Sequence, residues 1–422
     1  MQEIKYLIGL ILCCWSLTPA AAIINEIRYE GNNVTQVSLL NREIYIKKGD
    51  VLDNILVEKS RQAIMDLGLF KTAAFYLEEN GTNNESSDDS LVDVVFVVEE
   101  KYYMLVLPRL TIEDNEVYYG IQLRWDNVGG VNHSMRVLFQ DRGVTQGVNE
   151  RRNRFSYSYP NVNGSVYNVG MSIQENNWID ETEGVINRQD EMYSLDISRW
   201  LNSKGRNRGW FMGGRVLYQH RDNDVIVGAE LSDEFDAIVL GVESGYVSVS
   251  DYEYNRGGKA YGYKLDFSHE SIGSDVFFVK HYLYYRSYYR FNRFPLSNLN
   301  VQSIIGHSNN DILGEPAFTL DSRGDLRGYE DDRFSGNTML LTNIEYMFPH
   351  DGYPIIRYVG FVDIGNAYNR LSDVFHKPLH LGVGFGLRWK IRAFVNLDLR
   401  VDFGYAVTDS DYKFSFGSRN AF

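Results

Sequence analysis

Residues 395–405 read VNLDLRVDFGY, and apolar and polar side chains alternate along the whole stretch. Residues 381–390, LGVGFGLRWK, alternate in the same way, with glycine or a basic residue at every second position. A period of two places one kind of side chain on each face of a strand, so both stretches predict β-strands. Shorter runs of the same kind occur at residues 167–174 and 263–267.

The alternation recurs from residue 101 to the end of the sequence, in about sixteen runs, the even number typical of bacterial outer-membrane barrels. A barrel of that size has a lumen too wide for side chains to fill, so its apolar face must point outward to lipid. The predicted fold of residues 101–422 is therefore a transmembrane antiparallel β-barrel of about sixteen strands. The 30 tyrosines suit the aromatic girdles of such a barrel. A soluble two-sheet sandwich is the alternative.

Residues 23–100 predict a small α+β domain ahead of the barrel. We expect strands at 23–29, 70–78 and 91–99, and the order allows a short helix around 34–40. A longer helix is expected to begin after Asp53, a good N-cap residue, and to end at Gly68, which accepts the left-handed conformation.

Residues 1–22 are predicted to be a secretory signal peptide, with Lys5 before an apolar core and three alanines at the cleavage site. A retained anchor is the alternative, but the apolar run is shorter than the ~18 residues that a spanning helix needs. A lipoprotein is a second alternative, although Leu12 rather than a small residue precedes Cys13. Since Cys13 and Cys14 are the two cysteines, cleavage would remove every disulfide or thiolate site. Export without disulfides predicts the bacterial outer membrane, with residues 23–100 in the periplasm.

Two short motifs near the C-terminus carry opposite charges. Leu326-Arg327-Gly328-Tyr329 lies in the long polar segment 307–337, whose glycines would let it fold into the barrel. Phe361-Val362-Asp363-Ile364-Gly365 lies in the fourth strand from the end.

The alternation places Asp363 on the lumen face if Val362 and Ile364 face lipid. Gly365 lies on the same face and should leave room for the loop. Because a guanidinium engages a carboxylate in two-point geometry, we expect Arg327 to bind Asp363 inside the barrel. The alternative is that Arg327 is a solvated loop residue.

The last residues predict a closing strand. Tyr412, Phe414 and Phe416 alternate, and Phe422 is a terminal aromatic, as in the C-terminal signal by which outer-membrane barrels are recognised for assembly. The first and last strands, around 103–109 and 412–416, are predicted to meet at a weak seam.

These motifs resemble those of the bacterial surface antigen superfamily, which includes BamA, TamA, the two-partner secretion transporters and the mitochondrial Sam pore. The resemblance rests on Arg327-Gly328-Tyr329, on Phe334 and Gly336, and on the following NIEY at 343–346. Residues 23–100 resemble a POTRA domain, down to the Gly68-Leu69-Phe70 step after the helix.

The resemblance implies that the loop lies between the eleventh and twelfth strands and that its arginine meets the acidic residue of a Phe-x-Asp-x-Gly strand. The matching residues are Arg327, Gly328 and Tyr329 in the loop, and Phe361, Asp363 and Gly365 in the wall. Two features depart from the pattern: a single POTRA-like domain, and a turn at 389–393 without the Pro-x-Gly-Pro-like sequence.

Several classes of function are disfavoured by the sequence. A net charge of −14 argues against nucleic-acid binding. The sequence has no G-x-S-x-G, P-loop or H-E-x-x-H motif, and the eight histidines are scattered, so we expect no catalytic residue, metal or cofactor.

The resemblance implies a non-enzymatic pore that assists insertion or translocation. Its expected partners are outer-membrane lipid, an unfolded client protein or lipid, and accessory assembly proteins that bind the POTRA-like domain. A passive channel or receptor that keeps the fold is the alternative, and a purely structural surface protein is a third.

Overall fold

The structure is a computed structural model that describes residues 22–80, 90–113, 116–145, 148–180, 184–202, 204–228, 234–320, 324–331, 333–395 and 397–417. Apart from Ala22, the predicted signal peptide lies outside these residues, as does Phe422. Within them, no helix is both long enough and apolar enough to cross a membrane.

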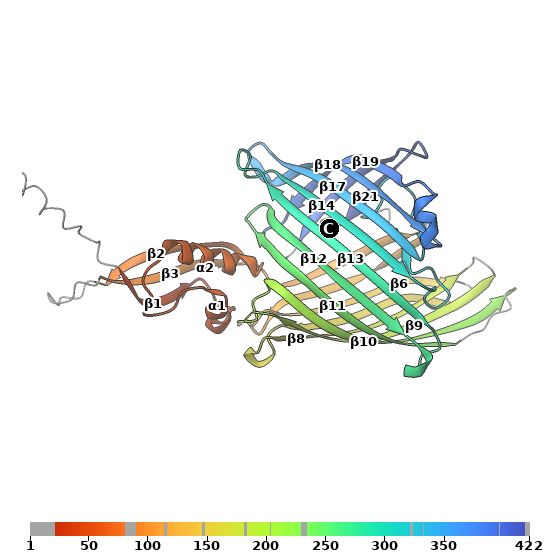
Figure 1. The fold of residues 1–422 in the computed structure, drawn as a ribbon, viewed down its shortest axis with the longest axis horizontal. Helices are drawn as coiled ribbons and strands as arrows, with labels where there is room; N and C mark the ends of the chain where they lie inside the picture. Colours follow the sequence, from red (N-terminus) through yellow and green to blue (C-terminus); the bar gives the residue numbers. More distant parts are fainter. Residues whose placement is uncertain are drawn as a thin grey trace, which may run out of the picture.

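A small α+β domain lies at one end of a large curved sheet (Figure 1). Its elements are β1 (Ile23–Glu30), α1 (Val37–Glu43), α2 (Asn54–Asp66), β2 (Phe70–Asn80) and β3 (Leu91–Glu100). The strand order is β1-β3-β2, with β1 parallel and β2 antiparallel to β3.

Helix α2 begins and ends as its sequence predicts. The Asp53 side chain accepts a hydrogen bond of 2.8 Å from the Ile55 N–H, and Gly68 follows the helix with φ +73°. Val57 and Ile64 are buried against the sheet residue Phe96 in one apolar core. The short helix α1 occupies 37–43 and so begins later than the predicted 34–40.

The second sheet has sixteen antiparallel strands, which confirms the predicted fold class. Every neighbour in this sheet is the next barrel strand along the chain, and the strands wrap around a common axis (Figure 1). The strands are β4 (Met104–Glu113), β5 (Glu116–Val128), β6 (His133–Thr145), β7 (Val148–Tyr159), β8 (Tyr167–Asp180), β9 (Val185–Trp200), β10 (Gly209–Val227), β11 (Phe235–Asp251), β12 (Arg256–Ser268), β13 (Phe278–Arg290), β14 (Asn298–Ser308), β17 (Thr338–His350), β18 (Tyr353–Tyr368), β19 (His380–Lys390), β20 (Asp398–Ala406) and β21 (Asp411–Gly417).

The apolar face of the sheet is the outer one. Phe385 and Phe414 are 64% and 67% exposed, whereas Asn343, Glu345 and Asp363 on the opposite face are at most 1% exposed. This arrangement is the reverse of that in a soluble barrel, and it suits a barrel whose outer face contacts lipid and whose lumen is polar.

The turn between β19 and β20 differs from the prediction. Val395 and Leu397 continue the alternation of β20, yet the strand begins only at Asp398. Both side chains are buried, and Val395 belongs to the apolar core of the small domain. Alternation cannot distinguish a residue that faces lipid from a turn residue covered by another domain, so the predicted strand began too early.

The small domain is docked on the barrel end that carries the β9–β10 and β11–β12 turns. Asp66 of α2 accepts hydrogen bonds from Arg208, at 2.8 Å, and from the main-chain N–H of Asp251, at 3.0 Å. Gln62 donates to the Asp251 carbonyl at 2.9 Å. Helix α2 is therefore fixed to the turns that join β9 to β10 and β11 to β12.

Strands β4 and β21 are the two edges of the barrel sheet. No backbone ladder joins these strands within the described residues. At the docked end, the Tyr102 N–H donates to Ala393 O at 2.7 Å, and Tyr102 forms a bridge with Phe394. The chain entering β4 is thus tied to the β19–β20 turn.

Candidate functional site: an inward loop and its charge network

The segment between β14 and β17 folds back onto the inner wall of the barrel. Strand β14 is the eleventh of the sheet counted from β4, and β17 is the twelfth. Within the segment, β15 (Phe318–Thr319) pairs with β16 (Ser335–Gly336). An apolar cluster holds the segment against β14 and β17; its buried members are Ile304, Ala317, Phe318, Leu320, Leu326, Tyr329, Phe334, Met339, Leu341 and Ala406.

Arg327 of this loop binds Asp363 of β18. Its Nε and Nη2 lie 2.7 Å from Asp363 Oδ2 and Oδ1, respectively, and its main-chain N lies 3.1 Å from Oδ2. Both side chains are buried, with exposures of 1% and 0%. The structure therefore brings together the two charged residues singled out in the sequence.

Asn343 of β17 completes the surroundings of the Asp363 carboxylate. Its Nδ2 donates to Asp363 Oδ1 at 2.9 Å and to the Asp325 carbonyl at 2.6 Å. Asn343 is the residue that faces Asp363 across the β17–β18 ladder. One amide thus holds both the wall carboxylate and the loop backbone.

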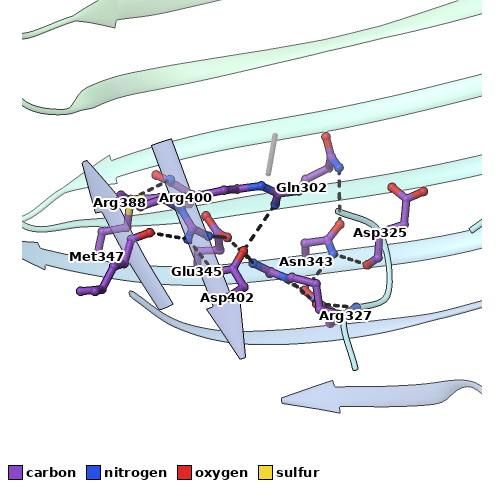
Figure 2. A network of polar contacts seen from close by, with 12 residues as sticks. Gln302, Asp325, Arg327, Asn343, Glu345, Met347, Arg388, Arg400 and Asp402 are labelled. Carbon is purple, nitrogen blue, oxygen red and sulfur yellow. Dashed lines mark hydrogen bonds and ion pairs between the residues drawn. The ribbon is translucent and has the colours of Figure 1, made fainter. Parts of the chain in front are cut away.

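The pair belongs to a larger network, which Figure 2 shows extending across β17, β19 and β20. Arg327 Nη1 lies 2.6 Å from Glu345 Oε1 and 3.6 Å from Asp402 Oδ2. Arg388 contacts the same two carboxylates, at 2.8 Å for Glu345 and 2.5 Å for Asp402.

Opposite charges are balanced in this network. Arg400 adds a third guanidinium, with Nη1 3.5 Å from Asp402 Oδ2. Three arginines therefore meet the three carboxylates of Asp363, Glu345 and Asp402. Because buried charges are tolerated when they are paired and hydrogen-bonded, the neutral sum allows the whole cluster to be buried.

The sequence prediction missed most of this network. Glu345, Arg388 and Asp402 each lie on the polar face of an alternating strand, but so do many other residues. Only the register between strands brings them within reach of Arg327, and that register is a long-range property. The alternation predicted correctly which face of each strand these residues occupy, but it did not predict which residues of neighbouring strands lie beside them.

The aromatic ring of Phe361 packs against the guanidinium of Arg327. The guanidinium carbon of Arg327 lies 3.6 Å from the centroid of the Phe361 ring. At this distance the cation rests on the negative face of the ring. Phe361 is 4% exposed, so the contact is shielded from water.

Glycines on the wall allow the loop backbone to approach closely. A Cβ atom at Gly382 would lie 2.3 Å from Arg327 O, and one at Gly404 would lie 2.6 Å from Gly328 N. Gly328 has φ +100°, and a Cβ there would meet the main chain of Tyr405 and Ala406. The loop tip therefore fits only against a wall without side chains at these points.

Gly365 has a different role from the predicted one. A Cβ atom there would meet Leu340 O at 2.9 Å and the Leu341 side chain at 3.0 Å, both on the neighbouring strand β17. Gly365 therefore makes room within the wall, whereas Gly382 and Gly404 make room for the loop.

Tyr329 attaches the far side of the loop to the wall. Its hydroxyl donates to Leu381 O at 2.9 Å, and its ring packs edge-on against Phe334 with a centroid distance of 5.2 Å.

Phe414 and Phe416, from the predicted C-terminal signal, lie in β21 and are each 67% exposed on the outer face.

The fold and the site define a class of protein: an outer-membrane β-barrel with an N-terminal POTRA domain and a loop locked inside the lumen. The chain belongs to the Omp85 superfamily, whose domain matches residues 127–422. Residues 22–101 match the POTRA family described as the surface antigen variable number repeat. The first match confirms the family predicted from the two motifs, and the second confirms the POTRA-like domain predicted at residues 23–100.

Solved structures share the fold at low sequence identity. BamA from Haemophilus ducreyi lacking POTRA domains 1–3 is 15% identical, with a TM-score of 0.55, over 94% of this chain and 84% of that one. CdiB from Acinetobacter baumannii is 14% identical, with a TM-score of 0.59, over 94% and 73%. CdiB from Escherichia coli is 13% identical, with a TM-score of 0.62, over 91% and 72%.

Proposed function

We propose that the protein is a non-enzymatic outer-membrane pore that assists the insertion or secretion of client proteins. The POTRA domain would lie in the periplasm, and the longer loops at the opposite barrel end would face the cell exterior. Membership of the Omp85 superfamily supports the general class of activity.

The observation that carries the proposal is the charge network that holds the inner loop on the wall beside one sheet edge. Its members lie on β17, β18, β19 and β20, and β20 pairs directly with the edge strand β21. A wall fixed in this way can stay ordered while the unladdered edges β4 and β21 separate. A client strand could then enter by pairing with an exposed edge.

The POTRA domain supplies a second kind of edge. Strand β2 lies beside the central β3, and its other side has no partner strand among the described residues. The outer side of β1, by contrast, already bonds at its start to residues 49–52. An extended client segment could bind beside β2 through main-chain hydrogen bonds before it reaches the barrel.

Site-specific photo-crosslinking in cells tests the proposal. Crosslinkers at Val106 in β4 and Tyr412 in β21 should trap envelope proteins during their assembly, because both side chains point outward at the edges. A crosslinker at Leu195, which is equally outward-facing but lies in the middle of the sheet in β9, is the control. Equal capture at all three positions would contradict the proposal.

A passive channel or receptor is the second candidate. One POTRA match, at residues 22–101, favours it, because one domain offers few surfaces to accessory proteins. Depletion separates the two functions: loss of an assembly pore should lower the level of other envelope proteins, and loss of a passive channel should not.

A further inference from the structure

A cavity of about 70 Å³ lies where the POTRA domain meets the barrel. Its walls come from the start of β2, the linker at Lys101, the β11–β12 turn at 252–255 and the β19–β20 turn. A single water needs roughly 10–15 Å³ by this kind of measure, so the space is large enough for a small polyatomic group.

Basic side chains predominate in the lining of this cavity. Its charged members are Lys71, Lys101, Arg256, Arg357, Arg388, Lys390 and Arg392, with Asp251, Glu253 and Asp398. Four of the cations have carboxylate partners within 3 Å, in the pairs Lys71–Glu99, Arg256–Asp251, Arg388–Glu345 and Arg392–Glu253.

The other three cations, Lys101, Arg357 and Lys390, contact neutral acceptors. Lys101 Nζ donates to Gly68 O at 2.7 Å, and Lys390 Nζ donates to Tyr252 O at 3.3 Å. Each ammonium has three N–H donors, so these hydrogen bonds leave further donors for a ligand.

Arg357 is the most enclosed of the three. It is 6% exposed, and its Nη1 and Nη2 donate to the carbonyls of Tyr254 and Leu296 at 3.2 and 3.3 Å. Nη2 also donates to the Asn298 side chain, and Nε has no hydrogen-bond partner. A buried guanidinium with an unused N–H lines the cavity.

Negative charge near these three cations is too small to balance them. The carboxylate whose charge acts on all three is Asp398. Asp251 also acts on the two lysines, but it is bound to Arg256. Burial is the main cause that lowers the pKa of Lys101 to about 8, and the positive charge of Lys390 lowers it further. Glu345 acts on Arg357 as well, but it is bound to Arg327 and Arg388. Three desolvated cations therefore share the charge of Asp398 with two carboxylates that already bind other arginines, and an anion would stabilise the excess positive charge.

We propose that this cavity binds a phosphate group through Lys101, Arg357 and Lys390. A phosphate offers several oxygen acceptors to donors that converge from different directions, and a guanidinium and two ammonium groups match that arrangement. Its charge offsets the excess of the three cations. The group could come from a lipid headgroup or from free phosphate.

Calorimetric titration of the full chain in neutral detergent tests the site. Short-chain phosphatidic acid should bind, and Lys390→Gln should weaken that binding about tenfold, as expected for the loss of a hydrogen bond to a charged group. Lys101→Gln should have a similar effect and provides a second variant if one substitution impairs folding. Arg293→Gln removes an exposed cation from the β13–β14 turn at the same barrel end, so it should bind as the wild type does.

Two further probes distinguish the sources. Competition by inorganic phosphate at comparable affinity would indicate free phosphate, and binding of the lipid alone would indicate a headgroup; both support a phosphate site. Equal binding of short-chain diacylglycerol, which lacks the phosphate, would overturn the proposal. So would unchanged affinity in folded Lys390→Gln and Lys101→Gln, or selective binding of a peptide carboxylate in place of phosphate.

Discussion

Arg327 holds the carboxylate of Asp363 with its main chain and its side chain at once: the backbone N lies 3.1 Å and Nε 2.7 Å from the same oxygen, Oδ2. The contact therefore fixes the path of the loop as well as the position of the guanidinium. A lysine could supply the charge, but it could not bind both carboxylate oxygens with planar geometry.

Asp363→Ala should destabilise the barrel. The substitution leaves Arg327 buried with fewer carboxylates, and breaking a buried ion pair costs about 3–5 kcal/mol. We expect the folded band in heat-modifiable gel mobility to be lost at a lower temperature, and we expect less assembled protein. Asp402→Ala, which leaves Arg388 and Arg400 with less compensation, should act in the same direction. Wild-type mobility and wild-type function in Asp363→Ala would show that the pair is not needed.

Gly404→Ala should release the loop from the wall. Its Cβ would lie 2.6 Å from Gly328 N, so the loop tip must move, at a cost of about 1–3 kcal/mol for an overpacked contact. Limited proteolysis should then cut between β14 and β17 faster than in the wild type. Gly360→Ala is the matched control, since a Cβ there meets no atom within 4 Å. Equal cleavage of both variants would argue against close packing of the loop.

Phe361→Leu should weaken the binding of Arg327 to the barrel wall by less than the loss of Asp363 does. The apolar volume is largely kept, but the ring under the Arg327 guanidinium at 3.6 Å is lost. A shielded contact of this kind contributes about 2 kcal/mol. Thermal unfolding followed by gel mobility measures the change. Phe385→Leu, on the outer face of β19 and 64% exposed, should have little effect in the same detergent.

Local pattern was enough to predict which face of β18 carries Asp363 and which segment carries Arg327. Alternation fixes the face of every strand residue, and the length of the segment after β14 marks a loop with its own structure. The strand count also followed, because antiparallel neighbours in this sheet are consecutive in the chain.

Interstrand relationships were not predictable in the same way. Glu345 contacts both Arg327 and Arg388 only because of the register of β17, β18 and β19. Val395 looked like a strand residue because its burial under the POTRA domain is also a long-range effect. Both features depend on contacts between segments that are distant in the sequence, and the alternation of apolar and polar residues along one strand carries no information about such contacts.

Acidification should tighten the docking of the POTRA domain. Burial raises the pKa of Asp66, which faces Gln62, Arg208 and the main chain of Asp251. The docked state therefore binds the proton more readily than the undocked state, so docking is favoured below the ordinary Asp pKa of about 3.9 and loses this contribution as pH rises through the raised pKa. Spin labels at Lys48→Cys and Arg293→Cys should report a larger docked population at about pH 4, near the ordinary Asp pKa, than at about pH 7, and Asp66→Asn should abolish the difference. A docked population that falls on acidification would contradict this sign.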